Sequence, residues 1–238
     1  MPEWFEEWFG DDYLRLYPHR DEAEARRAVE LLRRTLPWAT GWRVLDVACG
    51  PGRHARALEE AGAWCVGLDL SAALLARARQ VTSAPLVRAD MRQLPIRPFS
   101  MDLTVNLFTS FGYFDDDATH AAALAEMLAT VRPGGYFVID YLNADTVRAG
   151  LVPTDEIDEG GVRATVRRAL TGSGRFVTKT IHTADGRSYL ERVRLFTEAD
   201  LAAMLAQAGF GVIHRFGDYA GGPLVQGAPR TILMARAG

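Results

Sequence analysis

A strand–turn–helix unit near the start of the chain constrains its fold more than any other part of the 238-residue sequence. The run Arg43–Val47 predicts a buried strand, the glycine turn Gly50-Pro51-Gly52 follows, and Arg53–Ala61 predicts a helix. Glycines allow a backbone to approach a ligand closely, and the first turn of a helix presents free N–H groups. This order is typical of the first unit of a nucleotide-binding α/β sheet.

Strands and helices continue to alternate as far as Tyr141. Alternation of this kind predicts a mostly parallel sheet with helices on both faces. The predicted strands are Trp64–Leu68, Leu86–Arg88, Asp102–Phe108 and Tyr136–Tyr141, and the predicted helices cover 21–36 (capped by Asp21), 71–79 and 117–130, the last closed by a turn at Arg132–Gly135.

After Asp145 the pattern changes to an antiparallel meander. Its three predicted strands are Gly161–Leu170, Arg175–Thr183 and Arg187–Phe196, and Asp185-Gly186 predicts a two-residue hairpin turn between the last two. A helix capped by Thr197 and two strands, over 211–216 and 231–235, complete the predicted elements.

Composition excludes several classes of protein. The chain is 48% hydrophobic and 24% charged with a net charge of −3, which disfavours binding to nucleic acid. Its two cysteines, Cys49 and Cys65, form no disulfide framework, and no His or Cys spacing predicts a metal site. The acidic, aromatic N-terminus is no signal peptide, and no apolar run approaches the roughly 18–20 residues of a membrane span, so we expect a reduced, cytoplasmic protein.

Three aspartates indicate which nucleotide binds. The run Gly50–Ala55 also fits the dinucleotide fingerprint, but Asp46 before the glycines suits a cationic ligand better than a pyrophosphate. Asp69, at the end of the second strand, can accept hydrogen bonds from ribose hydroxyls. Asp90 can accept one from an exocyclic amine, and Met91 can cover one face of an adenine.

Together these segments resemble the class I S-adenosylmethionine-dependent methyltransferases. Val44–Gly52 is similar to the first motif of that family, although Ala48 stands where the family often has glycine. Val66–Leu70 is similar to the second motif, Ala89–Met91 to the adenine-contacting segment, Val105–Phe108 to the strand that faces the substrate, and Arg132–Asp140 to the turn and strand after the fourth helix.

The resemblance implies one Rossmann-like α/β domain with S-adenosyl-L-methionine as cofactor and S-adenosyl-L-homocysteine as product. We expect a seven-stranded, mostly parallel sheet closed by an antiparallel hairpin, with the β meander inserted. Within the single domain 1–238, we expect an N-terminal cap at 1–36, a cofactor-binding core at 37–145, a meander or lid at 150–196, and a C-terminal helix with closing strands at 197–238.

The resemblance also assigns the cofactor site. The backbone around the glycine turn is expected to hold the methionine part, Asp69 the ribose, and Asp90 with Met91 the adenine. Arg20 is expected to pair with the methionine carboxylate, and the rings of Tyr13 and Tyr17 to face the sulfonium. The full predicted set is Tyr13, Tyr17, Arg20, Asp46, Ala48, Gly50, Gly52, Asp69, Leu70, Asp90, Met91, Asn106 and Phe108.

Methyl transfer from a sulfonium is an in-line displacement, so positioning supplies much of the acceleration and a general base is needed only for a protonated nucleophile. The candidate catalytic residues are Asn106, Tyr113 and His54; the alternative for His54 is a polar first-turn residue without a chemical role. A small-molecule acceptor is expected to contact Phe111, Tyr113, His182, Asp218, Tyr219 and Arg230, although Phe111 can equally be a core residue.

The meander Val162–Leu195 holds eight basic and two acidic residues, a net charge of +6. Three interpretations stay open: a solvated strand face, a lid over an anionic acceptor, and a homodimer surface. Alternative functions are methylation of RNA or protein, NAD(P)-dependent oxidoreduction, and cofactor binding without catalysis. The sequence lacks the Tyr-x-x-x-Lys pair of many oxidoreductases and the Asn/Asp-Pro-Pro-aromatic motif of many amino-group methyltransferases of nucleic acids.

Overall fold

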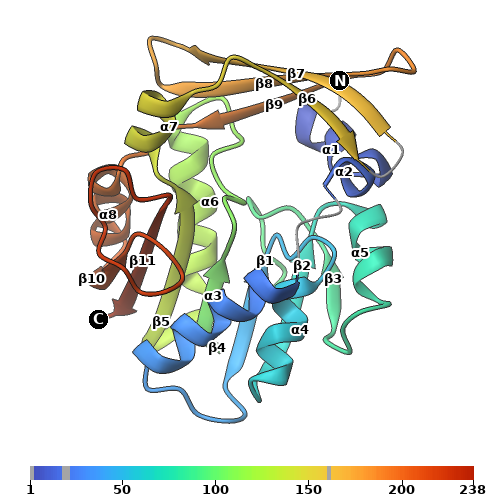
Figure 1. Cartoon of the computed structure of the whole chain (residues 1–238). Helices are drawn as coiled ribbons and strands as arrows, with labels where there is room; N and C mark the ends of the chain where they lie inside the picture. Colours follow the sequence, from blue (N-terminus) through green and yellow to red (C-terminus); the bar gives the residue numbers. More distant parts are fainter. Residues whose placement is uncertain (1–2, 18–21, 160–161) are drawn as a thin grey trace.

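The computed structural model of the protein describes residues 3–17, 22–159 and 162–238. Seven strands form the main sheet in the order β10-β11-β5-β4-β1-β2-β3 (Figure 1). The strands β1 to β5 pair in parallel, and β11 pairs antiparallel with both β5 and β10, as the sequence predicts. Their bounds are β1 Arg43–Val47, β2 Trp64–Asp69, β3 Leu86–Arg88, β4 Met101–Asn106, β5 Val131–Leu142, β10 Phe210–Phe216 and β11 Arg230–Ala237.

Helices cover both faces of this sheet because successive side chains of its central strands point to opposite sides. Val44 and Val105 face the helices α3 and α4, whereas Leu45 faces α6 and α8. Each face is a separate hydrophobic core, so the parallel strands are buried on both sides. The helices of the sheet are α3 Glu22–Thr35, α4 Arg53–Glu60, α5 Ala72–Ala78, α6 Asp117–Ala129 and α8 Glu198–Gln207.

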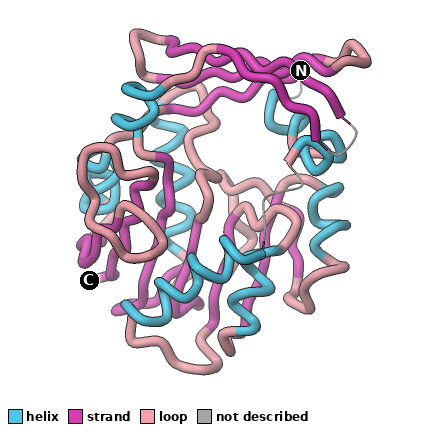
Figure 2. The backbone as a smooth tube through the Cα atoms, viewed as in Figure 1, coloured by secondary structure: helices cyan, strands magenta, loops and turns pink. Residues whose placement is uncertain are grey.

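A second, four-stranded antiparallel sheet lies across one end of the molecule, above the carboxyl ends of the parallel strands (Figure 2). Its strands are β6 Thr154–Glu159, β7 Val162–Thr171, β8 Phe176–Thr183 and β9 Ser188–Arg194. Two short helices, α1 Trp4–Trp8 and α2 Asp11–Leu16, form a cap beneath it. Trp8 and Leu16 of the cap are buried against Val166 and Ile181 of this sheet.

Five local features differ from the sequence predictions. The short helices α1 and α2, and also α7 at Ala144–Gly150, were not predicted from the sequence. Nor was β6, because its acidic sequence has low strand propensity; it forms through cross-strand partners, as in the Asp158–Arg163 ion pair of 3.0 Å. The segment Arg132–Gly135 is not a separate turn, because β5 already begins at Val131. The predicted Asp21 cap lies outside the described residues.

The described residues include no helix that is long and apolar enough to cross a membrane.

One glycine of the main sheet is fixed by packing rather than by its backbone angles. A Cβ on Gly67 of β2 would lie 2.8 Å from Leu86 Cδ2 and 2.9 Å from Cys49 Sγ. We therefore expect Gly67→Ala to lower the free energy of unfolding by about 1–3 kcal/mol through overpacking. Differential scanning calorimetry measures this, with Gly211→Ala on β10 as control, because nothing lies within 4 Å of that Cβ. Equal melting temperatures for the two variants would contradict the packing argument.

Candidate active site

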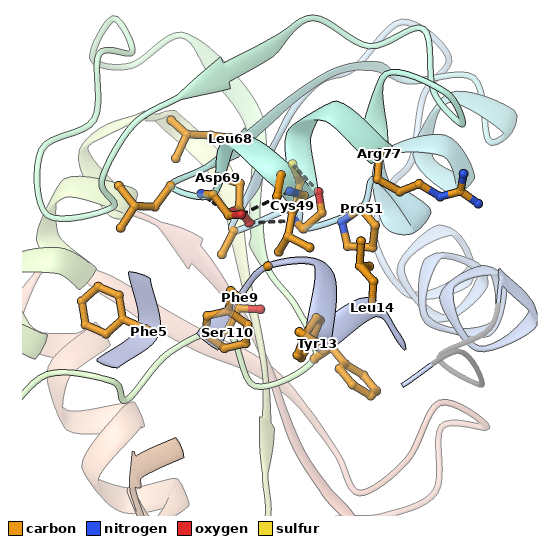
Figure 3. A pocket seen from close by; sticks show the side chains of 18 of the residues that line it. Phe5, Phe9, Tyr13, Leu14, Cys49, Pro51, Leu68, Asp69, Arg77 and Ser110 are labelled. Atoms are coloured by element: carbon orange, nitrogen blue, oxygen red, sulfur yellow. Dashed lines mark hydrogen bonds between the residues drawn. The ribbon is translucent and has the colours of Figure 1, made fainter. Parts of the chain in front are cut away.

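A cavity of about 900 Å³ lies between the cap and the carboxyl ends of the parallel strands (Figure 3). Its wall combines segments that are far apart in the sequence. The cap contributes Phe5, Phe9, Tyr13, Leu14 and Tyr17; the core contributes Ala48, Gly50, Pro51, Arg53, His54, Asp69, Leu70, Asp90, Met91, Phe108, Ser110, Tyr113 and Phe114.

The glycine turn adopts backbone angles that few residues other than glycine accept. Gly50 has φ of +54° and Gly52 has φ of +87°, and Ala48 before them has φ of +59°. A Cβ on Gly52 would lie 2.9 Å from Ala78 Cβ, so α4 begins in close contact with α5. The turn thereby exposes backbone to the cavity at the start of α4, where free N–H groups are available.

Asp69 fixes this turn from the neighbouring strand. Its two carboxylate oxygens accept hydrogen bonds of 2.8 Å, one from the backbone N–H of Gly50 and one from that of Ser71 (Figure 3). Burial raises the pKa of the Asp69 carboxyl, while these backbone donors oppose the rise. The residue predicted to hold a ribose therefore also positions the backbone around the predicted methionine site.

Asp46 lies beneath the cavity wall rather than in it. Its carboxylate is 1% exposed, and its Oδ2 has no hydrogen-bond partner in the described part of the chain. Burial and the nearby Asp69 raise the pKa of Asp46 to about 8, although Arg53 and the Ala55 N–H favour the charged form. An ionised Asp46 is therefore costly in the absence of a ligand.

At the other end of the cavity, Asp90, Met91 and Leu70 form part of the wall. Asp90 accepts hydrogen bonds from Arg92, the shortest being 2.6 Å from Nη2 to Oδ2, and Arg92 also pairs with Glu3 at 2.7 Å. Partial burial raises the pKa of Asp90, but the contacts with Arg92 outweigh it and hold that pKa below its ordinary value. This carboxylate is therefore charged at neutral pH and tied to the start of the cap.

His54 stands in the first turn of α4, at the cavity wall. It is 5% exposed, and its Nε2 has no hydrogen-bond partner among the described residues. Burial, with the positive charges of Arg53 and Arg230, holds the pKa of His54 well below its ordinary value. The imidazole is therefore neutral at neutral pH and can accept a hydrogen bond or a proton.

The segment after β4 contains both wall residues and buried supports. Phe108 and Tyr113 line the cavity. Asn106 lies beneath the wall and is fully buried, where its Nδ2 donates to the carbonyls of Val47 at 3.1 Å and Ser110 at 3.3 Å. Phe111 is also fully buried and stacks on Phe196 with ring centroids 5.7 Å apart. It is therefore a core residue, which was the alternative to a substrate contact.

The cap is fastened to the second sheet at the point where Tyr17 meets Lys179. Tyr17 and the Lys179 ammonium are hydrogen-bonded, and that ammonium also lies 3.2 Å from Glu191. Glu191 in turn accepts a hydrogen bond of 3.1 Å from the Trp8 indole. Tyr13 and Tyr17, two of the predicted cofactor residues, line the cavity from the cap side, and the second sheet covers the cap. Arg20, the third predicted residue of this segment, lies outside the described residues.

The predicted substrate residues near the closing strands meet at Asp140 rather than at the cavity wall. Tyr219 donates its hydroxyl to Asp140 Oδ2 at 2.6 Å, and Arg230 Nε donates to Oδ1 at 2.7 Å. Asp218 accepts the Gly222 N–H in a local turn at 2.9 Å. His182 is exposed on the second sheet, with Nδ1 2.8 Å from Ser188 Oγ. Neither these three residues of the closing segment, Asp218, Tyr219 and Arg230, nor His182 is among the described residues that line the cavity.

The charge of the meander is mostly compensated. Seven of its eight basic residues form ion pairs with carboxylates. Most of the partners belong to other segments, such as Asp12 of α2 and Asp117 of α6. The net charge of +6 counted along the sequence therefore overstates the positive field of this sheet.

Several wall residues were not singled out by the sequence analysis. Phe5, Phe9 and Leu14 come from the cap, whose density of aromatic residues was the available signal. Asp140, which does not line the cavity, was also not singled out. It is a carboxylate inside an apolar strand, and a charged residue in an apolar run was the available signal that it has a specific role. No group of three or more His, Cys, Asp or Glu residues that could hold a metal ion occurs in the described ranges.

Comparisons with known proteins identify the family. A family model described as a methyltransferase domain matches residues 44–135. The dTDP-3-amino-3,6-dideoxy-alpha-D-glucopyranose N,N-dimethyltransferase of Streptomyces fradiae is 31% identical over 92% of this chain and 86% of its own length. The chain belongs to the class I S-adenosylmethionine-dependent methyltransferases. A related dTDP-amino-sugar N,N-dimethyltransferase from Streptomyces venezuelae is 30% identical over 87% of this chain and 90% of its own.

Solved methyltransferase structures share the whole architecture. The sugar N-methyltransferase KedS8 from Streptoalloteichus is 28% identical, with a TM-score of 0.74 over 96% of this chain and 93% of its own. A methyltransferase from Clostridium acetobutylicum has a TM-score of 0.80 over 95% and 96% of the two chains, and at 18% identity it supports the fold alone. S-adenosylmethionine is the cofactor of this methyltransferase.

The described residues fit that cofactor. Gly50 of the glycine turn lines the cavity, and the acidic residues Asp69 and Asp90 lie on the same wall, whereas Gly52 is buried outside it. Asp46 beneath this wall has a buried oxygen without a partner, which suits a ligand that carries positive charge.

Burial of Asp46 leads to a pH-dependent prediction for the ligand-free protein. Its pKa is about 8 in the folded state, against an ordinary value of 3.8, so the folded state binds more protons than the unfolded state between these limits. The stability that this group contributes is full below pH 4 and is lost as the pH rises to about 8. Because Asn cannot ionise, we expect Asp46→Asn to be more stable than the wild type at pH 9, by about 1.4 kcal/mol for each unit between the two pKa values and with a higher melting temperature, and to differ little at pH 4.

Thermal melts from pH 4 to pH 9 measure this difference. Asp102→Asn is the control with the opposite sign, because Asp102 is held ionised by Arg43 and Arg132 despite its partial burial. A melting temperature of Asp46→Asn below that of the wild type at pH 9 would overturn the assignment.

Proposed function

We propose that this methyltransferase transfers the methyl group to the amine of a small, sugar-like acceptor linked to a nucleotide. The observation that carries the proposal is a cavity lined both by aromatic residues of the cap and by His54, whose Nε2 has no hydrogen-bond partner among the described residues. An aromatic wall suits the ring of a sugar, and a neutral imidazole suits an amine that donates a hydrogen bond. The two Streptomyces dimethyltransferases, which act on dTDP-amino sugars by name, support this acceptor.

The glycine turn, Asp69, Asp90 and Met91 keep the roles that the sequence predicts, whereas Tyr13 and Phe108 of the predicted cofactor set are reassigned to the acceptor. When bound, S-adenosylmethionine supplies a methyl group on a sulfonium, which makes the sulfur a good leaving group. The backbone at Gly50 and Gly52 binds its methionine part, Asp69 its ribose, and Asp90 with Met91 its adenine. The remaining wall, with Tyr13, Phe108 and Tyr113, receives the acceptor and excludes water from it.

An amine attacks with its lone pair and carries one surplus proton once the N–C bond has formed. We propose that His54 Nε2 accepts a hydrogen bond from the attacking amine and orients its lone pair, while the surplus proton leaves with the product as an ammonium, because the low pKa of His54 opposes its protonation. The nearby guanidinium groups of Arg53 and Arg230 also disfavour a protonated amine in the same space, which keeps the nucleophile neutral. Positioning supplies the rest of the acceleration.

A nucleotide-linked acceptor is anionic, and the paired charges of the second sheet are poor candidates for its phosphates. Arg15 and Arg77 are more suitable, because both line the cavity and their side chains are exposed. We propose that they contact the phosphates at the mouth of the cavity.

Radiolabelled S-adenosylmethionine with a panel of nucleotide-linked amino sugars tests the proposed acceptor. We expect label in the amino sugars and none in matched sugars that carry a hydroxyl in place of the amine. RNA and protein fractions run in parallel. Label in those fractions alone, or in the hydroxyl sugars, would overturn the proposal while leaving the methyltransferase family intact.

Removal of Asp69 tests the cofactor assignment. We expect Asp69→Ala to weaken S-adenosylhomocysteine binding by about tenfold or more, because a charge-assisted hydrogen bond contributes about 1.5–3 kcal/mol. Isothermal titration calorimetry measures this, and a cofactor analogue without ribose hydroxyls separates ribose contact from support of the glycine turn. If Asp69 contacts the ribose, the variant and the analogue lose less together than the sum of their separate losses. Full additivity would assign Asp69 to the turn alone.

A further inference from the structure

The segment 107–113, here called the acceptor loop, leaves β4 in an unusual conformation. Phe108 and Thr109 both have φ of +60°, in the left-handed region that residues with a Cβ rarely occupy. Two such residues in succession persist only where surrounding contacts impose the conformation. Phe108 is at the same time part of the cavity wall.

Asp140, near the end of the neighbouring strand β5, supplies those contacts. Its Oδ2 accepts the Phe108 N–H at 2.9 Å, and its backbone carbonyl accepts the Thr109 N–H at 2.9 Å. Both left-handed residues are thus bonded to a single residue of the rigid sheet. Asp140 is fully buried and is not among the residues that line the cavity.

The carboxylate of Asp140 is itself held in one orientation. Arg230 Nε donates to Oδ1 at 2.7 Å, and the Tyr219 hydroxyl donates to Oδ2 at 2.6 Å. Arg230 also donates to Thr109 Oγ1 at 3.3 Å, so the same guanidinium contacts both the carboxylate and the loop. With these donors in place, Asp140 has no exposed oxygen for a substrate.

The held residues in turn place two rings at the cavity. The Tyr113 hydroxyl donates to the Thr109 carbonyl at 2.7 Å. The Phe108 ring lies between two guanidinium groups, 4.2 Å from that of Arg53 and 5.1 Å from that of Arg230. The positions of both rings therefore depend on the backbone that Asp140 fixes.

We propose that Asp140, held by Tyr219 and Arg230, is a positioning residue that sets the acceptor loop for methyl transfer. It acts through the placement of Phe108 and Tyr113 and not by contact with the substrate. This assigns Tyr219 and Arg230 to the support of the loop rather than to the wall. The effect on turnover rests on the proposed function, whereas the effect on loop geometry does not.

Asp140→Asn is the direct test, because the side chain keeps its size but presents an amide N–H where Tyr219 or Arg230 donates. We expect kcat with the labelled amino sugar to fall by about a hundredfold, the cost of a small misplacement in a site of this kind. The affinity for S-adenosylhomocysteine is expected to change by less than about threefold, because none of the hydrogen bonds that Asp140 makes within the described residues reaches the glycine turn, Asp69 or Asp90. The matched control is Asp102→Asn, which breaks the 2.6 Å pair with Arg132 at the opposite end of β4 and is expected to lower stability without lowering kcat.

A second variant distinguishes positioning from stability alone. Glycine adopts left-handed backbone angles without strain. The double variant with Asp140→Asn and Thr109→Gly is therefore expected to have a kcat at least about tenfold higher than that of Asp140→Asn alone. Tyr219→Phe, which removes one donor and keeps the ring, is expected to lower kcat in the same direction and serves if Asp140→Asn does not fold. An unchanged kcat in both Asp140→Asn and Tyr219→Phe, or a loss of kcat that follows melting temperature alone, overturns the proposal.

Crystal structures of the variants with S-adenosylhomocysteine test the loop independently of any acceptor. We expect the Tyr113 hydroxyl to leave the Thr109 carbonyl in Asp140→Asn and to stay there in Asp102→Asn. An undisturbed loop in Asp140→Asn overturns the positioning role, whereas the absence of any amino-sugar turnover in the wild type overturns the proposed function alone.

Discussion

The hydrogen bonds from Gly50 and Ser71 to Asp69 are the interactions on which the site depends. They tie the turn after β1 to the turn after β2, and each turn starts a helix, α4 and α5. The close contact between Gly52 and Ala78 then sets the spacing of those helices. Because the backbone donors are fixed by a buried carboxylate, the surface at the glycine turn is already formed without a ligand, which reduces the ordering that binding there requires.

The opposite wall, which the cap forms, depends on the second sheet. The cap is too short to bury its own apolar and aromatic residues, and these residues pack against the second sheet instead. The network of Tyr17, Lys179 and Glu191 fastens the two together. In Figure 1 the sheet lies above the cap. None of the described residues of β6 to β9 lines the cavity, and the basic residues of the sheet mainly bind carboxylates of other segments. The meander is better described as a support of the wall than as the surface that selects an acceptor.

Between these walls, the acceptor loop leaves β4 of the core and places Phe108 and Tyr113 at the cavity. Asp140 connects β5, β11 and the loop, so the closing hairpin of the sheet contributes to the site without contacting the cavity. His54 is kept neutral by its burial and by the positive charges of Arg53 and Arg230. An amine in this space would have a lowered pKa for the same reason, which links the electrostatics of the core to the proposed nucleophile.

The sequence by itself determined the alternation of strands and helices, the glycine turn and the resemblance to the family, because each depends on residues that are near one another along the chain. It also indicated Asp69, Asp90 and Met91, which follow predicted strands and therefore meet at one edge of the sheet. Only the tertiary structure decided that Asn106 and Phe111 lie beneath the wall, that Tyr219 and Arg230 meet at Asp140, and that most of the meander's charge is paired. These outcomes depend on contacts between segments far apart in sequence, and local pattern carries no information about such partners.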